Sequence, residues 1–166
     1  STGNLLTPYT HPFKVELAAT YLDHMKFEAN AAGGGELHWM RMHNSPYHPA
    51  QKLVCSTIDR PGIIASTTVK MGPYSLFVLN LVMSSSDPAI APLLKSPVST
   101  AEKLLMTPQA RAATARVMVV HGSWEQVQQC ADALRMVDIL ICGNLNQAFE
   151  TPMKRGSSLV LSAGDS

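Results

Sequence analysis

Apolar and polar residues alternate along several short segments of this chain, which is the period-two pattern of half-buried strands. The clearest case is 74–85 (YSLFVLNLVMSS), a run rich in β-branched and aromatic residues. The same pattern predicts strands at 36–43, 51–58, 63–71 and 111–120. The sequence therefore predicts that most of the chain before residue 122 is β-structure joined by turns.

Two segments interrupt this pattern. Residues 31–36 contain three consecutive glycines, which hold a regular element poorly, so we predict a turn there. Because a strand is predicted to follow, this turn lacks the helix N-terminus that a phosphate-binding loop needs. Residues 86–108 carry four prolines and predict a long connection with one short helix around 100–106. The segment 11–22 fits either a strand or the start of an amphipathic helix, and we favour the strand.

The segment GSWEQVQQCADALRMVDILICGN (122–144) has a helical pattern. Ser123 is a good N-cap, and Gln126 stands at capping-box spacing from it. Apolar residues follow at helical intervals, so we predict one helix over 123–142, ended by Gly143. The alternative ends the helix earlier and makes VDILIC (137–142) a strand, which would create a β-α-β unit. Strands followed by helix favour an α+β fold with an antiparallel sheet.

Composition narrows the class of protein. Charged residues make up 15 %, the formal net charge is +1 and 46 % of residues are apolar. So little charge suggests that other subunits cover part of the surface, and the neutral balance gives no overall polyanion-binding signature. No apolar run reaches the length of a membrane span, and the start lacks the features of a secretion signal. The three isolated cysteines suit a reducing compartment.

Sequence motifs of catalysis are absent: there is no nucleophile elbow, P-loop, HExxH or CxxC sequence. His38, His43 and His48 recur every five residues, a spacing that puts His38 and His43 on opposite faces of a predicted strand. We therefore predict no metal site, no cofactor and no catalytic residue, and hence a protein that is not an enzyme.

Short polar and basic residues occupy alternate positions on two successive predicted strands. Lys52 and Ser56 share one face of the first, and Thr68 and Lys70 share one face of the second. If these faces coincide, the ammonium groups and hydroxyls could bind an RNA backbone and its unpaired bases. The alternative is an ordinary solvated face of a sheet.

The motifs Lys52-x-x-Cys55-Ser56 and, after a turn, Thr-Val-Lys at 68–70 resemble the coat proteins of single-stranded RNA bacteriophages of the levivirus type. The order of elements over roughly 45–150 is similar too. This resemblance implies an antiparallel sheet of about five to seven strands, N-terminal hairpin included, followed by C-terminal helices that pack on a dimer partner's sheet. It makes 1–166 a single coat-protein domain. Its parts are a mostly β region (1–85), a long inter-strand loop (86–110), the last strand (111–122), helices (123–150) and a C-terminal tail (151–166).

The resemblance also implies a function. The chain would form homodimers, assemble into an icosahedral shell in the host cytoplasm and reside in the virion. It would package single-stranded RNA through Lys52, Ser56, Thr68 and Lys70, and repress replicase translation through an RNA stem-loop. Val54 and Ile58 depart from the family pattern, which weakens the case for stem-loop recognition. Two alternatives stay open: a homodimeric interaction protein without RNA, and a small α/β enzyme.

Overall fold

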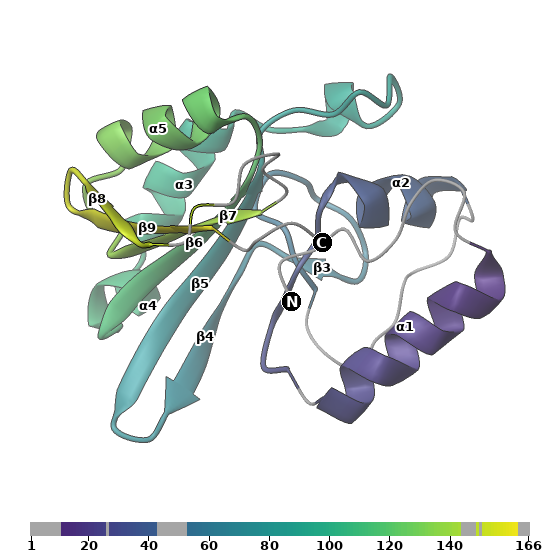
Figure 1. Cartoon of the computed structure of the whole chain (residues 1–166), viewed down its shortest axis with the longest axis horizontal. Coiled ribbons are helices and arrows are strands. Elements are labelled where there is room, and N and C mark those ends of the chain that lie inside the picture. Colours follow the sequence, from purple (N-terminus) through teal and green to yellow (C-terminus); the bar gives the residue numbers. More distant parts are fainter. Residues whose placement is uncertain (1–10, 26, 43–52, 144–148, 150, 163–166) are drawn as a thin grey trace.

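The computed structural model describes residues 11–25, 27–42, 53–143, 149 and 151–162 of the 166-residue chain (Figure 1). Its helices are α1 (Pro12–Met25), α2 (Gly34–Met42), the 3-10 helix η1 (Ala91–Leu93), α3 (Pro97–Leu105), α4 (Pro108–Ala112) and α5 (Trp124–Ala133). Its strands are β1 (Asn30–Ala31), β2 (Leu53–Val54), β3 (Ile63–Ile64), β4 (Ser66–Met71), β5 (Tyr74–Val82), β6 (Ala115–His121), β7 (Ile139–Gly143), β8 (Met153–Arg155) and β9 (Ser158–Ser162).

The strands form two sheets. The larger sheet has the order β4-β5-β6-β7-β9-β8, and its inner neighbours β5, β6, β7 and β9 are all parallel. Each outer strand, β4 and β8, pairs antiparallel with its neighbour. The smaller sheet has the order β1-β2-β3 and is parallel. Parallel neighbours require crossover connections; α3 and α4 lie in the connection from β5 to β6, and α5 lies in the connection from β6 to β7.

One core lies between the larger sheet and the crossover helices, where α3 and α5 run along the same side of the sheet (Figure 1). Alternate residues of β5 and β6 pack there against α3 and α5. The strands contribute Leu79, Leu81, Met118 and Val120, and the helices contribute Ala101, Leu105, Val127 and Cys130. A second core joins α1 and α2 to the smaller sheet, and it includes Val82 from β5. Since Val82 faces away from the crossover helices, β5 contributes to both cores.

Asn80 in the middle of β5 connects the two sheets. Its side-chain Nδ2 donates to the carbonyls of Ala32, at 2.8 Å, and Val54, at 2.9 Å. Its backbone N–H donates to Ser56 Oγ at 3.1 Å, and its carbonyl accepts from the Ser56 N–H at 2.7 Å. Asn80 is fully buried, so these hydrogen bonds satisfy polar groups that water does not reach. We call this group of contacts the Asn80 seam.

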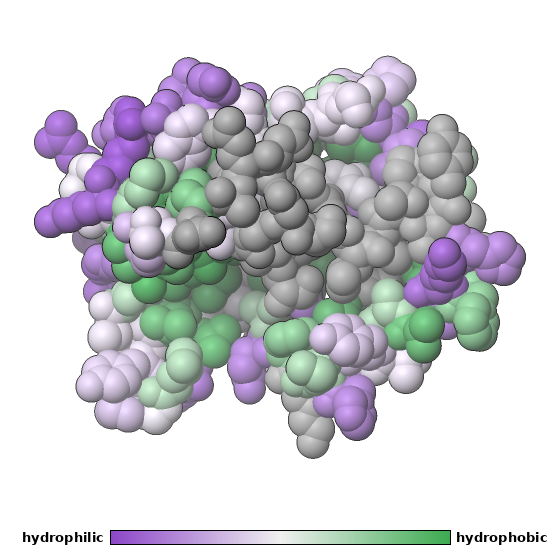
Figure 2. Space-filling view, in the orientation of Figure 1, coloured by the Kyte–Doolittle hydropathy of each residue, from purple (hydrophilic) through white to green (hydrophobic). Residues whose placement is uncertain are grey.

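Helix α1 is apolar on two faces. Val15 and Leu22 are buried in the second core. Phe13, Leu17, Tyr21 and Met25 recur every fourth residue and are 66 %, 59 %, 51 % and 47 % exposed. Residues four apart lie on one face of a helix, so these four form a single exposed row. Figure 2 shows apolar surface where Figure 1 places this helix.

The predicted antiparallel α+β fold is wrong, because the inner strands of the larger sheet are parallel and alternate with helices. The predicted helix over 123–142 ends at Ala133, and residues 139–143 form β7 between β6 and β9. The β-α-β alternative is therefore correct. The region 111–122 does not hold the last strand, and 151–162 of the supposed tail contributes β8 and β9.

Several other segments also differ from expectation. The favoured strand at 11–22 is helix α1, and the predicted turn and strand over 31–43 are largely helix α2. The connection 86–110 is not simply a loop, since α3 and α4 lie in it; the short helix expected around 100–106 corresponds to α3. The strands predicted at 63–71 and 74–85 are present as β3 to β5. The single-domain organisation of 1–166 stays a prediction.

Candidate functional site

The carboxyl ends of the four parallel strands of the larger sheet lie along one edge. These ends are Val82 of β5, His121 of β6, Gly143 of β7 and Ser162 of β9. In open α/β sheets, ligands bind outside the carboxyl ends of the strands, where loops bring side chains together. This edge, which we call the carboxyl edge, is therefore the expected location of a ligand-binding site.

His121 is the polar side chain at the centre of the carboxyl edge. It is 6 % exposed, and neither of its ring nitrogens has a hydrogen-bond partner among the described residues. Burial lowers the pKa of His121 to about 4, so its imidazole is neutral at pH 7. A neutral imidazole has one N–H donor and one acceptor nitrogen. Leaving such a buried group unpaired costs about 1–3 kcal/mol, and an unpaired buried group of this kind is a candidate for a functional role.

Two closely packed glycines lie beside His121 in the fold, Gly143 on the neighbouring strand and Gly122 next in the chain. A Cβ atom at Gly143, its partner on β7, would lie 2.6 Å from His121 Cε1 and 2.7 Å from Nδ1. A Cβ atom at Gly122 would lie 2.7 Å from Cγ of Met83 and 2.6 Å from Gln126 Oε1. All four distances are far shorter than van der Waals contact, so neither position has room for a side chain. The imidazole therefore packs directly against the β7 backbone at Gly143.

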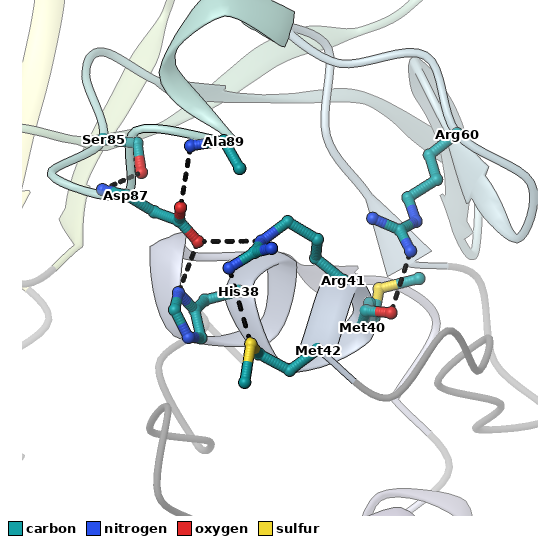
Figure 3. A network of polar contacts seen from close by, with 8 residues as sticks. All are labelled: His38, Met40, Arg41, Met42, Arg60, Ser85, Asp87 and Ala89. Atoms are coloured by element: carbon teal, nitrogen blue, oxygen red, sulfur yellow. Dashed lines mark hydrogen bonds and ion pairs between the residues drawn. The ribbon is translucent and has the colours of Figure 1, made fainter.

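The loop after β5 carries a second polar cluster, in which Asp87 joins helix α2 (Figure 3). Asp87 Oδ2 accepts from His38 Nδ1 at 2.5 Å and from Arg41 Nε at 3.1 Å, and Oδ1 accepts from the Ala89 N–H at 2.9 Å. The Ala89 N–H, followed by Arg41 and His38, holds the pKa of the Asp87 carboxyl below its usual value. Both oxygens of this carboxylate are thus engaged within the protein.

The residues predicted to bind RNA are not all on one surface. Ser56 is 1 % exposed, donates its hydroxyl to the Ala65 carbonyl and belongs to the Asn80 seam. Thr68 and Lys70 are exposed on β4, two positions apart. Lys52 lies outside the described residues. The structure therefore brings together Thr68 and Lys70 and separates Ser56 from them by burial.

Sequence reasoning missed His121. The only local signal is its place at the end of a β-rich run, immediately before a glycine (ARVMVVHG). This local signal does not by itself indicate a site. His121 becomes a candidate only because β6 and β7 are parallel neighbours, which places Gly143 beside its imidazole. The three histidines that the sequence did single out are distributed differently. His38 belongs to the Asp87 cluster, and His43 and His48 lie outside the described residues.

Comparison with solved structures identifies the fold. The chain superposes on the sulfate thiohydrolase SoxB from Thermus thermophilus with a TM-score of 0.73 and 15 % identity, covering 97 % of this chain and 32 % of that one. Superposition on a 5'-nucleotidase precursor from the same organism gives a TM-score of 0.72 at 16 % identity, covering 98 % of this chain and 38 % of that one. Superposition on Haemophilus influenzae NAD nucleotidase gives a TM-score of 0.70 at 10 % identity, covering 97 % of this chain and 39 % of that one. This chain therefore spans between about a third and two-fifths of the length of each of these proteins. No known protein family and no curated protein matches its sequence.

The α/β layout thus matches a metallophosphatase/nucleotidase fold. The resemblance to phage coat proteins is wrong, and the homodimer, icosahedral shell, RNA partner and virion location that rested on it are withdrawn. The solved structures it superposes on are those of enzymes, which contradicts the prediction of a non-enzymatic structural protein. The small α/β enzyme, previously an alternative, fits better. Among the described helices, none combines the length and apolar character needed to cross a membrane.

A metallophosphatase fold implies a metal centre, which several side-chain ligands would have to hold. The described part of the chain contains no cluster of three or more His, Cys, Asp or Glu side chains able to hold an ion. Burial raises the pKa of Cys130 to about 11 and that of Cys142 to about 12, so both are thiols and not the thiolates that bind metals. At the carboxyl edge, His121 is one suitable ligand. The described residues do not fit a metal centre.

Proposed function

We propose that this chain forms the ligand-binding edge of a hydrolase acting on a phosphoester, with a 5'-nucleotide as the ligand class. The observation that carries the proposal is the buried, unpaired imidazole of His121 at the carboxyl ends of parallel strands. The fold supports it, because proteins named 5'-nucleotidase, NAD nucleotidase and phosphatase share this layout. In such sheets the carboxyl edge is where ligands bind.

His121 has a defined role in this proposal. Because its imidazole is neutral at pH 7, it donates one N–H to an oxygen of the ligand and accepts one hydrogen bond at its other nitrogen. The close packing of the ring against Gly143 fixes it before the ligand arrives. A fixed donor loses little entropy on binding, so its hydrogen bond contributes more to affinity or to stabilisation of the transition state than a mobile one would.

The test uses the full chain and a panel of 5'-nucleotides, NAD and a simple aryl phosphate. Isothermal titration calorimetry measures binding, release of inorganic phosphate measures hydrolysis of the phosphomonoesters, and chromatography of the two mononucleotide products measures cleavage of NAD. We expect at least one nucleotide to bind and to be hydrolysed, and His121→Ala to reduce both by tenfold or more. His24→Ala, at an exposed position of α1, is the matched control and leaves both unchanged. Absence of binding and of phosphate release across the panel would overturn the proposal.

A further inference from the structure

The metallophosphatase fold implies a bound metal, but the described residues at the carboxyl edge do not provide enough ligands for one. A structural zinc site needs about four ligands, and hard divalent cations need about six oxygen ligands with carboxylates among them. We propose that the carboxyl edge of this chain binds its ligand without a divalent metal, and that the His121 imidazole contacts the ligand itself. This inference rests on the proposed function.

The polar groups near the ends of β2 and β5 are already engaged. Ser56 Oγ donates to the Ala65 carbonyl and accepts from the Asn80 N–H at 3.1 Å. Thr57 Oγ1 accepts from the Val82 N–H at 3.2 Å. Cys55 is fully buried, and burial raises the pKa of its thiol. A metal could recruit these groups only by breaking the contacts that hold the smaller sheet to β5.

The carboxylate in the loop after β5 is not available either. Asp87 gives one oxygen to the Ala89 N–H and the other to Arg41 and His38. A cation that bound this carboxylate would have to displace the guanidinium and would lie close to its positive charge. Repulsion between like charges at such short range is unfavourable even near the protein surface.

Among the described residues at this edge, His121 keeps two unpaired nitrogens, and the residue of β7 that faces it, Gly143, has no side chain. A single neutral imidazole is too few ligands for a stable metal site, but it suits a hydrogen bond to a phosphoryl or hydroxyl oxygen. The imidazole therefore occupies the position of a direct contact to the ligand.

The experiment uses the full chain after exhaustive treatment with a chelator. Nucleotide affinity is measured by calorimetry in EDTA, in Mg²⁺ and in Mn²⁺, and cobalt(II) is titrated while its visible absorption is recorded. We expect affinities within twofold of one another in the three buffers and no cobalt spectrum of a protein-bound ion. His121→Ala weakens nucleotide binding by about tenfold in every buffer, and His24→Ala does not.

Two results would overturn the inference while leaving the proposed function intact. One is nucleotide binding that EDTA abolishes and Mn²⁺ restores. The other is a one-to-one cobalt(II) complex whose absorption disappears in His121→Ala. A chain that binds no nucleotide in any of the three buffers would overturn both the inference and the proposed function.

Discussion

Gly143 lies so close to His121 that a Cβ atom on it would be 2.6 Å from the imidazole Cε1. Gly143→Ala must therefore displace the ring or the strand, and we expect a loss of about 1–3 kcal/mol in the free energy of unfolding, as for other overpacked sites. Chemical denaturation measures it. Gly34→Ala is the control, because no atom lies within 4 Å of its added Cβ.

The same pair can be tested by a double-mutant cycle. In Gly143→Ala/His121→Ala the ring that opposes the new methyl group is gone, so most of the loss should be recovered. Equal stability losses in Gly143→Ala and Gly34→Ala would show that the imidazole is not packed against Gly143.

His121 should also make stability depend on pH. Its pKa is lowered from 6.5 to about 4 in the folded chain because burial disfavours the charged form. Between these two values the unfolded chain binds a proton that the folded chain does not, so stability rises with pH across this window and is complete above about 6.5. Acidification from pH 6.5 to 4 should cost about 3 kcal/mol at this site.

His121→Ala should flatten that part of the stability profile, measured by urea denaturation at a series of pH values. His24→Ala, on exposed α1, should keep the slope of the unmodified protein. An unchanged slope in His121→Ala would mean that the imidazole is not held neutral by burial.

Asn80→Ala should loosen the smaller sheet. The change removes the donor to the buried Ala32 carbonyl and one of two donors to the Val54 carbonyl, which also accepts from the Ala32 N–H at 2.9 Å. One unsatisfied buried carbonyl costs about 1–3 kcal/mol, so we expect a loss of that size in the free energy of unfolding. Thr68→Ala, exposed on the neighbouring strand, should change it by no more than about 0.5 kcal/mol. Similar losses of stability in Asn80→Ala and Thr68→Ala would contradict a stabilising role of the Asn80 seam.

Ser123→Ala should weaken helix α5. Ser123 Oγ accepts from the Gln126 N–H, and Gln126 Oε1 accepts from the Ser123 N–H at 2.9 Å, which completes a capping box. Loss of such a cap costs about 1 kcal/mol with alanine and only a few tenths with glycine, measured by thermal or chemical denaturation. If Ser123→Ala is as stable as Ser123→Gly, the cap contributes nothing.

The capping box illustrates what the sequence could predict, since Ser123 and Gln126 interact within one turn of chain. Strand β5 was predictable for the same reason, because its residues carry their own β-forming pattern. Helix α2 also had a local signal that was overlooked. The Glu36 carboxylate accepts from the Gly33 N–H at 2.9 Å, which closes the start of a helix that the three glycines had suggested was a turn.

Strand β7 shows where local reasoning fails. Val137 and Ile141 are spaced to continue the apolar stripe of α5, yet Leu140 and Cys142 are buried on one face of β7 while Ile139 and Ile141 are half-buried on the other. Its conformation is decided by β6 on one side and β9 on the other, strands that are distant in sequence. The pairing of β6 with β7 also places Gly143 beside His121. The candidate site could therefore be recognised only once the strand order of the sheet was known.

The two hairpins that border the larger sheet have a consequence for how the chain folds. β4–β5 and β8–β9 each close over a tight turn, whereas pairing β5 with β6 must bring together strands separated by residues 83–114. Closing a short loop costs less chain entropy, so the hairpins should form early and the parallel centre late. The carboxyl edge would then be among the last regions to be assembled, and mutations there should mainly accelerate unfolding and leave the refolding rate nearly unchanged.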